Sequence, residues 1–352
     1  MLWGVGLACL LALSSGCLEP PGESTAQPGS ETPTAGPPWI EIFFTNPKSP
    51  SADSYRGGPD KNLAEAIDQS RLSVDIAAFD LNLWSVRDAL IRAKKRGVTV
   101  RMVTESDNLD EQEIQDIKEA GIPVLGDRRE GLMHNKFVVI DRAEVWTGSM
   151  NYTTTDGYLN NNNLVRIRSA KMAENYTTEF KEMFEDDLFG PDTRADTPYP
   201  KLEIEGSLVE TYFSPDDHTA SHLIELVNQA KQSVYFLAYS FTSDELADAM
   251  LSREQAGVTV AGVFEESQIY SNIGSEYDRL LQAGIDVRKD GNPHNMHDKV
   301  IIIDEAIVVT GSYNFSASAE QRNDENTIIL HDTSSAAQFL AQFMQIFEDG
   351  HR

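Results

Sequence analysis

The sequence is poor in cysteine, and this excludes a fold that depends on disulfide bonds. Only two cysteines, Cys9 and Cys17, occur in 352 residues. Cys9 lies inside the apolar segment that opens the chain, so a mature chain beginning at Cys17 has one thiol and no internal partner for it. The two domains that this length allows must therefore be stabilised by hydrophobic cores, and hydrophobic residues make up 40% of the composition.

Positive charge is also scarce. Lys and Arg number 29 against 56 Asp and Glu, which gives a net charge of −27. Such a surface repels polyanions at long range and disfavours nucleic acid as a bulk partner. Salt screens this field within about 8–10 Å, so a local basic cleft on an acidic shell is compatible with the same composition. An acidic surface can also be an adaptation to high salt that has no bearing on the substrate.

The first residues, MLWGVGLACLLALSSGC, form a short apolar run with small residues before Cys17. This pattern is typical of a secretory signal peptide rather than a membrane span, and LSSGC resembles the bacterial lipoprotein signal, whose cysteine becomes acylated. We therefore predict a signal peptide at 1–16, lipidation at Cys17 and an exported, membrane-anchored lipoprotein on the cell surface or periplasmic side. An ordinary signal peptide of a secreted protein is the alternative. Residues 17–38 are rich in Pro, Gly, Ser, Thr and Glu, which predicts a flexible tether.

An internal repeat dominates the rest of the chain. SVDIAAFDL matches SVYFLAYSF, and GVTVRMV matches GVTVAGVF, both 160 residues further on. MHNKFVVID recurs as MHDKVIIID, 163 residues further on. The change in spacing predicts three extra residues in a loop or helix end of the second copy, between Gly257 and Ala283.

Each copy alternates strand-like and helix-like segments. Residues 98–103 and 258–264 are short and β-branched, as buried strands are. Amphipathic stretches precede them and predict helices, with Asn82 and Ser243 as N-caps. The sequence thus predicts an α/β protein of two tandem α/β/α sandwich domains with mixed sheets. The predicted domain boundaries are 39–195 and 196–352.

Each copy also carries one chemical motif, H-x-K-x4-D followed by G-S-x-N. The motif residues are His134, Lys136, Asp141, Ser149 and Asn151 in the first copy, and His297, Lys299, Asp304, Ser312 and Asn314 in the second. His and Lys two residues apart on a strand point to the same face. Imidazole can act as a nucleophile or a general acid near neutral pH. The Lys ammonium supplies positive charge to phosphoryl oxygens, and Ser and Asn add neutral hydrogen-bond donors.

These paired motifs resemble the HKD motifs of the phospholipase D superfamily, which includes phospholipases D, cardiolipin synthases and metal-independent nucleases. The resemblance implies two phospholipase D-type domains related by a pseudo-two-fold axis, with one active site at their interface. It also implies phosphodiester cleavage through a phosphohistidine, with no metal or other cofactor. Both motifs lie in one chain, which removes the need for a dimer, and we expect a monomer. The family pattern assigns Asp141 and Asp304 an orienting role through ion pairs. It makes Ser149, Asn151, Ser312 and Asn314 the expected substrate-binding residues.

The two copies differ downstream of the motif, where Glu325 stands in place of Asn162. Family members often carry a glutamate there, near a motif histidine. If Glu325 contacts His297, its charge favours the imidazolium and suits that residue to acid–base catalysis. His134, beside a neutral amide, then stays unprotonated and attacks phosphorus. We interpret His294 as a rim residue rather than a metal ligand, because neither Cys nor a third ligand accompanies it.

Three functions are compatible with these motifs. A phospholipase D that releases phospholipid head groups and leaves phosphatidic acid is favoured, because the expected anchor and tether hold the enzyme near a bilayer. A sequence-nonspecific nuclease of the same superfamily is the alternative, with DNA or RNA as its substrate. A surface protein that binds phosphate without turnover is disfavoured, since both motif sets are intact.

Overall fold

The protein is described here from a computed structural model, which covers residues 37–352. The predicted signal peptide, Cys17 and all but the last two residues of the predicted tether lie outside the described residues. Within 37–352, no helix combines the length and hydrophobicity needed to cross a bilayer.

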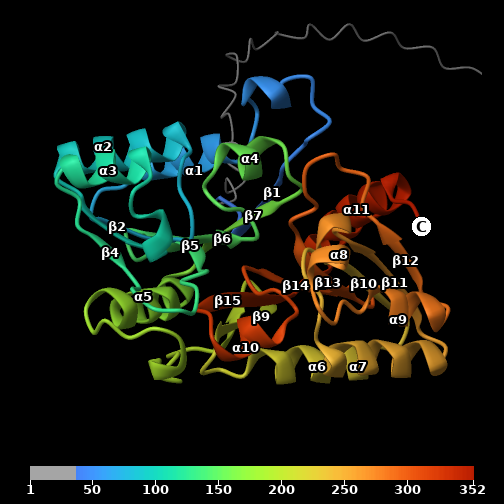
Figure 1. Ribbon diagram of the computed structural model, residues 1–352. Coiled ribbons are helices and arrows are strands. Elements are labelled where there is room, and N and C mark those ends of the chain that lie inside the picture. Colours follow the sequence, from blue (N-terminus) through green and yellow to red (C-terminus); the bar gives the residue numbers. More distant parts are fainter. Residues whose placement is uncertain (1–36) are drawn as a thin grey trace, which may run out of the picture. The chain divides into compact units, whose positions relative to one another are not determined.

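The first half forms a mixed seven-stranded sheet with the strand order β1-β7-β6-β5-β2-β3-β4 (Figure 1). Its strands are β1 (Ile40–Phe44), β2 (Ser73–Ala78), β3 (Thr99–Thr104), β4 (Val124–Gly126), β5 (Lys136–Ile140), β6 (Glu144–Gly148) and β7 (Asn163–Arg168). The pairs β2–β3 and β3–β4 are parallel, and the others are antiparallel. Every residue of β5 is buried, as expected for a central strand of a sheet that is covered on both faces.

Helices cover both faces of this sheet. On one face α1 (Asp60–Gln69), α2 (Trp84–Arg96) and α3 (Gln112–Glu119) share a core with Ile76 and Trp146. On the other face α5 (Ala170–Phe184) contacts β5 and β6. The short elements of this half are η1 (Ala52–Ser54), η2 (Ser106–Asn108), α4 (Thr154–Tyr158) and η3 (Gly190–Asp192).

The second half repeats this arrangement with one extra strand, in the order β12-β11-β10-β13-β14-β15-β9-β8. Its strands are β8 (Lys201–Ile204), β9 (Ser207–Ser214), β10 (Ser233–Ala238), β11 (Thr259–Phe264), β12 (Asp286–Lys289), β13 (Lys299–Ile303), β14 (Ile307–Gly311) and β15 (Glu325–His331). Its helices are α6 (Thr219–Gln229), α7 (Asp244–Gln255), α8 (Glu266–Ser271), α9 (Tyr277–Gln282), α10 (Ala317–Gln321) and α11 (Thr333–Asp349). The predicted α/β architecture of two similar halves is confirmed.

A single hydrophobic core joins the two halves. It contains side chains of both sheets together with those of α5 and α11. The ring of Tyr176 on α5 lies edge-on between Phe137 of β5 and Phe213 of β9, with centroids 5.0 and 5.1 Å away. Burying an aromatic side chain of this kind contributes about 1.5–3 kcal/mol. The two sheets therefore pack as one compact unit, while 39–195 and 196–352 as separate domains stay a prediction.

Two local predictions have different outcomes. Ser243 caps α7, because its side chain accepts a hydrogen bond from the backbone N–H of Leu246. Asn82 as a cap is wrong: α2 begins one residue later than expected, after the extended residue Leu83, with no side-chain cap. The Asn82 side chain instead accepts a hydrogen bond from the N–H of Thr154 at 2.8 Å, so it ties the start of α2 to α4.

The three-residue insertion lies where the spacing predicted it. After β3 the chain makes the short η2 and then α3, whereas after β11 it makes the longer α8 and then α9. The strands that follow keep their register, since Ala78 pairs with Lys136 and Ala238 pairs with Lys299.

Candidate active site

The two His–Lys pairs stand at the entrances of equivalent central strands. Lys136 is the first residue of β5 and Lys299 the first residue of β13, with His134 and His297 two residues earlier. Both histidines are buried, with 9% of each side chain exposed, and both lysines are buried as well. Each lysine Nζ donates to the carbonyl oxygen of its own histidine, at 2.8 and 2.6 Å.

Backbone hydrogen bonds join the two halves of the chain at these histidines. The N–H of His134 donates to the carbonyl of Asp324 at 3.0 Å, and the N–H of His297 donates to the carbonyl of Asn161 at 2.9 Å. Each histidine is thus held by the opposite half of the chain. The two motifs therefore form one site between the sheets, as the resemblance implied.

The side chains that contact the histidines also come from the opposite half of the chain. The predicted contact of Glu325 with His297 is therefore wrong. Its carboxylate accepts from Nδ1 of His134, at 2.7 and 2.9 Å, and not from His297. His297 Nδ1 instead lies 3.0 Å from Oδ1 of Asn162, with Asp156 3.5 Å away. The sequence argument assigned each residue to the histidine of its own copy. The pseudo-two-fold packing brings the start of β15 to the histidine of the first copy instead.

These contacts fix the protonation of both rings. A carboxylate only accepts hydrogen bonds, so Nδ1 of His134 carries the proton and Nε2 is the remaining nitrogen. The amide of Asn162 donates to Asp156 at 2.8 Å, so its Oδ1 is the atom that accepts from His297. Both imidazoles therefore have Nε2 available for chemistry.

The electrostatics of the two histidines differ. Burial lowers the pKa of His134, while Glu325 opposes that effect. Burial lowers the pKa of His297 further, and the positive charges of Lys299 and Lys136 act in the same direction. Burial alone would raise the pKa of Glu325, but the contact with His134 lowers it overall, so this carboxylate is ionised at neutral pH.

Each motif serine donates a hydrogen bond to the side chain that contacts a motif histidine. Ser312 Oγ donates to Glu325 at 2.6 Å, and Ser149 Oγ donates to Asn162 at 2.9 Å. Each serine follows a glycine, and a Cβ at Gly311 would lie 2.1 Å from the carbonyl oxygen of Asn326. The glycine therefore permits a close approach of strands that any side chain would block. Direct contact of either serine with substrate stays a prediction.

The motif asparagines are differently placed. The Oδ1 atoms of Asn151 and Asn314 are buried and have no hydrogen-bond partner within residues 37–352. A buried unpaired carboxamide is costly unless a ligand or water completes it. These two side chains are therefore available to phosphate oxygens, and substrate binding by them stays a prediction.

Two aromatic residues of the site were missed by the sequence argument. Phe79 packs edge-on against His134, with ring centroids 4.9 Å apart, and Tyr239 does the same against His297 at 4.5 Å. The lysine ammonium groups lie 5.0 and 4.6 Å from the same two ring centroids. Both aromatics stand at equivalent places in the repeated segments SVDIAAFDL and SVYFLAYSF, which was the available signal.

The motif aspartates anchor the fold, but not through ion pairs as predicted. Asp304 accepts from the backbone N–H groups of Lys231, Gln232 and Ser233 at 2.7–3.0 Å. Asp141 binds the three equivalent N–H groups at 71–73. Both aspartates have a left-handed backbone conformation, with φ of 54° and 52°, at the turn after β5 or β13. Their carboxylates cap the starts of β2 and β10, and neither contacts a histidine or a lysine of the motifs.

Replacement of Asp304 by asparagine is expected to lower the free energy of unfolding by about 1–2 kcal/mol, since charge-assisted hydrogen bonds are lost. Burial raises the pKa of Asp304, but the three N–H donors lower it overall. Its stabilisation is therefore present above the unfolded pKa of about 3.9 and disappears as the pH falls through the folded value. Urea unfolding at pH 7 and pH 3 measures this, with Glu305→Gln, on the exposed neighbour, as the control. Equal stability of both variants at pH 7 would contradict the anchoring role.

Among the described residues, no group of three or more His, Cys, Asp or Glu side chains is arranged to hold a metal ion. His294 lies on the wall of a cavity beside the second motif, and its N–H donates to Asn292 at 2.9 Å. This agrees with a rim position, and His294 is not within a ligand cluster.

Comparisons with known proteins agree with this geometry. The family model for the PLD-like domain of cardiolipin synthase matches twice, at residues 63–184 and 223–347. A phospholipase D of Rickettsia prowazekii is 34% identical over 142 residues, which cover 40% of this chain and 69% of that protein. A mitochondrial cardiolipin hydrolase of Chlamydomonas reinhardtii is 28% identical over 169 residues, covering 41% of this chain and 75% of that protein.

The solved phosphatidylserine synthase of Haemophilus influenzae has the same overall fold. It matches with a TM-score of 0.67 at 13% identity, and the match covers 88% of this chain and 86% of that one. The family model and these relatives define a phosphodiesterase hydrolase, and the two buried histidines are its candidate catalytic residues. The chain belongs to the phospholipase D superfamily.

Proposed function

We propose that the protein is a phospholipase D, which hydrolyses phospholipid head groups and leaves phosphatidic acid. The observation that carries the proposal is the pair of buried His–Lys sets in one site, each held by the opposite half of the chain. Two imidazoles with free Nε2 atoms and two ammonium groups can surround one phosphate. The ammonium groups neutralise charge that develops on the phosphoryl oxygens, which is the task of a divalent ion in other phosphodiesterases.

The reaction proceeds in two displacements. In the first, Nε2 of one histidine forms a bond to phosphorus while the bond to the head-group oxygen breaks. That oxygen takes the electron pair and receives a proton from the other histidine. In the second displacement, the histidine that gave its proton removes a proton from water. The oxygen of this water attacks phosphorus, and the bond between phosphorus and the nucleophilic histidine breaks. The products are a free alcohol and a phosphomonoester.

We propose His134 as the nucleophile and His297 as the acid. These are the roles that the sequence analysis predicted, but the reason differs, because Glu325 contacts His134 and not His297. A phosphorylated imidazole with a proton on Nδ1 carries a positive charge, and the Glu325 carboxylate at 2.7 Å stabilises that charge. His297 Nδ1 contacts the neutral amide of Asn162, and the Asp156 carboxylate lies farther away, at 3.5 Å. Burial and the two lysines lower the pKa of His297, so its imidazolium is the stronger acid and gives its proton readily to an alkoxide. The negative charge of bound phosphodiester favours the protonated form of His297 before the reaction.

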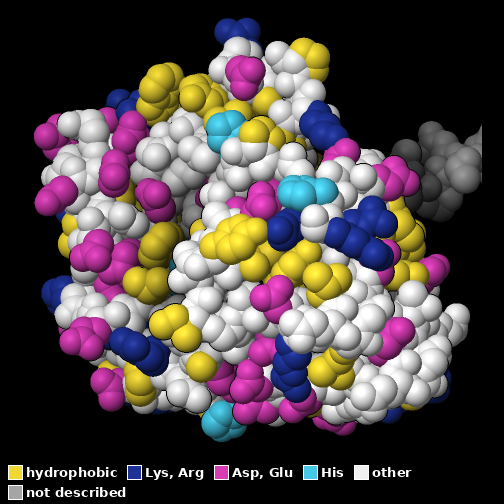
Figure 2. All heavy atoms as spheres, turned by 45° about the vertical axis from the view of Figure 1, so that its right-hand side comes forward, with side chains coloured by type: hydrophobic (Ala, Val, Ile, Leu, Met, Phe, Trp, Pro, Cys, Tyr) yellow, Lys and Arg dark blue, Asp and Glu magenta, His cyan; other side chains and the backbone are white. Residues whose placement is uncertain are grey.

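A lipid substrate is supported by the charge of the chain and by the relatives. The net charge is −27, and acidic side chains are spread over the face shown in Figure 2, which is unfavourable for a long polyanion. Relatives that match one half of the chain are called phospholipase D and cardiolipin hydrolase. We further propose that lipidation at Cys17 anchors the exported enzyme as a monomer and keeps the site near a bilayer.

The test is to give the purified protein phosphatidylcholine vesicles and plasmid DNA in separate reactions, both with EDTA. The expected result is release of choline without nicking of DNA. Nicking without choline release would overturn the proposal in favour of a nuclease, and neither activity would favour a phosphate-binding protein. The variant with His134→Asn and His297→Asn together is the control for contaminating hydrolases.

The activity is expected to depend on pH through the buried lysines. Burial lowers the pKa of Lys136 to about 8, and burial together with Lys136 lowers the pKa of Lys299 to about 7. The required positive charge is present below these values and lost as the pH rises through them. We therefore expect kcat/KM to fall above about pH 7–8, while kcat persists to higher pH because bound phosphate favours the charged form. A kcat/KM that stays level up to the ordinary lysine value of 10.5 would contradict this assignment.

A further inference from the structure

Two pairs of buried carboxyl groups support the segments that carry the motif histidines. Glu105 follows β3 and Asp127 follows β4, while Glu265 follows β11 and Asp290 follows β12. The strands β3 and β4 are parallel neighbours, as are β11 and β12, so each pair stands where two adjacent strands end. All four residues are buried. The mechanism above gives none of them a role.

The glutamate of each pair holds the backbone immediately before a histidine. Oε2 of Glu105 accepts a hydrogen bond from the N–H of Met133 at 3.0 Å, and Oε2 of Glu265 accepts one from the N–H of Met296 at 2.7 Å. Both methionines are fully buried, and each precedes a motif histidine. A displacement of either glutamate would therefore displace a histidine.

The aspartate of each pair fixes the backbone next to its glutamate. Oδ1 of Asp127 accepts from the N–H of Ser106 at 3.0 Å, and Oδ1 of Asp290 accepts from the N–H of Glu266 at 2.9 Å. Ser106 and Glu266 are the residues that follow the two glutamates. The same set of contacts thus occurs in both halves, although the side chains that contact the histidine rings differ.

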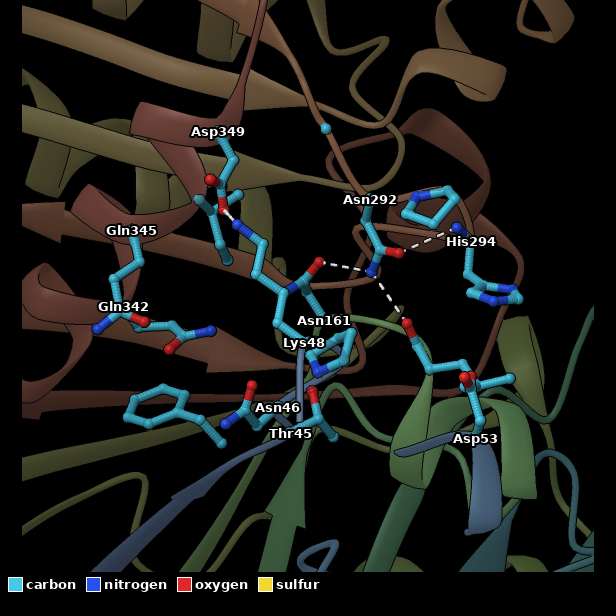
Figure 3. A pocket seen from close by; sticks show the side chains of 16 residues that line it. Thr45, Asn46, Lys48, Asp53, Asn161, Asn292, His294, Gln342, Gln345 and Asp349 are labelled. Atoms are coloured by element: carbon cyan, nitrogen blue, oxygen red, sulfur yellow. Dashed lines mark hydrogen bonds and ion pairs between the residues drawn. The ribbon is translucent and has the colours of Figure 1, made fainter. Parts of the chain in front are cut away.

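A second connection runs from the aspartate to the carbonyl that accepts the histidine's own N–H. In the second half, the N–H of Asn292 donates to Oδ2 of Asp290 at 3.0 Å. The side chain of Asn292 donates to Oδ1 of Asn161 at 2.8 Å (Figure 3). The carbonyl of Asn161 in turn accepts the N–H of His297 at 2.9 Å.

In the first half, Arg129 takes the place of Asn292, at the spacing of 163. Arg129 forms an ion pair with Asp324, whose carbonyl accepts the N–H of His134. The Nε atom of Arg129 lies 3.9 Å from Oδ2 of Asp127. In each half, the carboxyl pair is therefore connected to the histidine backbone on two sides.

Each pair must hold a proton. The two carboxyl groups of a pair are hydrogen-bonded to each other, and an ionised carboxylate can only accept, so one member is protonated. Oδ2 of Asp127 is buried and receives no other hydrogen bond within residues 37–352. A protonated Glu105 can donate to Asp127 with one oxygen while the other accepts from Met133.

The electrostatics agree with a shared proton. Burial and the charge of Asp127 raise the pKa of Glu105 to about 7. Burial and the charge of Asp290 also raise the pKa of Glu265. The other charged or titratable groups that face the pairs are Asp107, Arg129 and Asp324 in the first half, and Glu266 and Tyr239 in the second.

We propose that Glu105 and Glu265 are positioning residues of the active site. Each fixes one motif histidine through the backbone N–H that precedes it, and each is held in place by a proton shared with its aspartate partner. Glu105 acts on the nucleophile His134, and Glu265 acts on the acid His297. The inference rests on the two displacements of the proposed function, but it does not depend on whether the natural substrate is a lipid or a nucleic acid.

The test uses bis(p-nitrophenyl) phosphate, a soluble phosphodiester that belongs to neither substrate class. With enzyme in excess, release of p-nitrophenolate reports the first displacement, whereas steady-state kcat includes the second as well. Glu105→Ala is expected to slow the first displacement by about 10–100-fold, because a small misplacement of a reacting group has an effect of this size. Glu265→Ala is expected to keep the first displacement, since this leaving group needs no acid, and to lower kcat.

Two further variants separate positioning from general loss of structure. In Glu105→Gln, the amide can accept from Met133 and donate to Asp127 without an added proton, so the first displacement is expected to return nearly to the parent rate. Glu276→Ala removes another buried carboxyl group, which binds Arg279 at 3.1 Å and contacts neither motif. This control is expected to lower Tm and leave both rates unchanged.

The pH dependence of stability provides a readout without catalysis. The folded protein keeps the proton of Glu105 up to about pH 7, whereas the unfolded chain releases it near the ordinary pKa of 4.5. The stabilisation from this proton is therefore full below pH 4.5 and is lost as the pH rises through about 7. Since the amide needs no such proton, the Tm of Glu105→Gln relative to the parent is expected to increase from pH 5 to pH 8.

Equal slowing of the first displacement by Glu105→Ala and Glu265→Ala, or no slowing by either, would overturn the positioning roles. A Tm difference between Glu105→Gln and the parent that is the same at both pH values would overturn the shared proton. A parent enzyme that cleaves bis(p-nitrophenyl) phosphate and DNA but no lipid would refute the phospholipase D proposal and leave the positioning roles standing. A parent that cleaves no phosphodiester would refute both.

Discussion

The His297→Asn variant is expected to become covalently labelled at His134 when it receives a phosphatidyl ester of p-nitrophenol. This leaving group needs no proton, so the first displacement continues without the acid and produces a burst of p-nitrophenolate. The second displacement then stalls, because the residue that activates water is missing. Turnover of natural substrate is expected to fall by roughly 10⁴-fold, the upper range for loss of general acid–base catalysis. Mass spectrometry of an adduct that is stable in alkali and labile in acid identifies the phosphohistidine.

The His134→Asn variant provides the matched comparison. It retains the acid but lacks the nucleophile, so it is expected to give neither a burst nor an adduct. Label found on His297 in this variant would reverse the two roles. It would show that a histidine hydrogen-bonded to the Asn162 amide is the better nucleophile than one hydrogen-bonded to the carboxylate of Glu325.

The Lys299→Met variant is expected to separate catalysis from stability. Loss of one preorganised charge that faces the transition state lowers kcat by about 10²–10³-fold. Stability is expected to be equal or higher at pH 6, because the lowered pKa of Lys299 means that the folded protein disfavours its charged form. Methionine fills a similar volume without a charge to desolvate. Steady-state kinetics and thermal unfolding of the same sample give both quantities.

Lys95→Met is the control for this experiment, since Lys95 is an exposed residue on α2. It is expected to change neither kcat nor Tm. A Lys299→Met enzyme with kcat within a few-fold of the parent would remove the lysine from the proposed mechanism. A kcat loss explained by unfolding would appear as a lower Tm.

Much of the fold could be predicted because the chain repeats itself. Identical spacing within MHNKFVVID and MHDKVIIID fixed the equivalent strands β5 and β13, and the change from 160 to 163 located the insertion. The resemblance to the phospholipase D superfamily implied that the two His–Lys pairs meet in one site, whereas the repeat itself only placed one pair at the start of each strand. These features depend on local sequence, which a repeat reports twice.

The repeat could not predict the side-chain contacts between the two halves of the chain. Spacing shows that Glu325 and Asn162 are equivalent, but it does not show which histidine each one meets. The answer depends on how β7 and β15 lie against the opposite sheet, and the result is an exchange of partners. The binding of Asp304 to backbone N–H groups was missed for a related reason, because backbone donors have no signature in the sequence.

The exchange of partners at the histidines has a consequence for symmetry. A dimer of identical half-length chains must place the same residue beside both imidazoles, so its two histidines are equally acidic before substrate binds. Each binding event then decides which of them acts as the nucleophile. Joining two unlike halves in one polypeptide removes that degeneracy. A carboxylate is hydrogen-bonded to one ring and an amide to the other, so the two histidines differ before substrate binds. Under the proposed mechanism, this difference decides which side of the phosphodiester leaves.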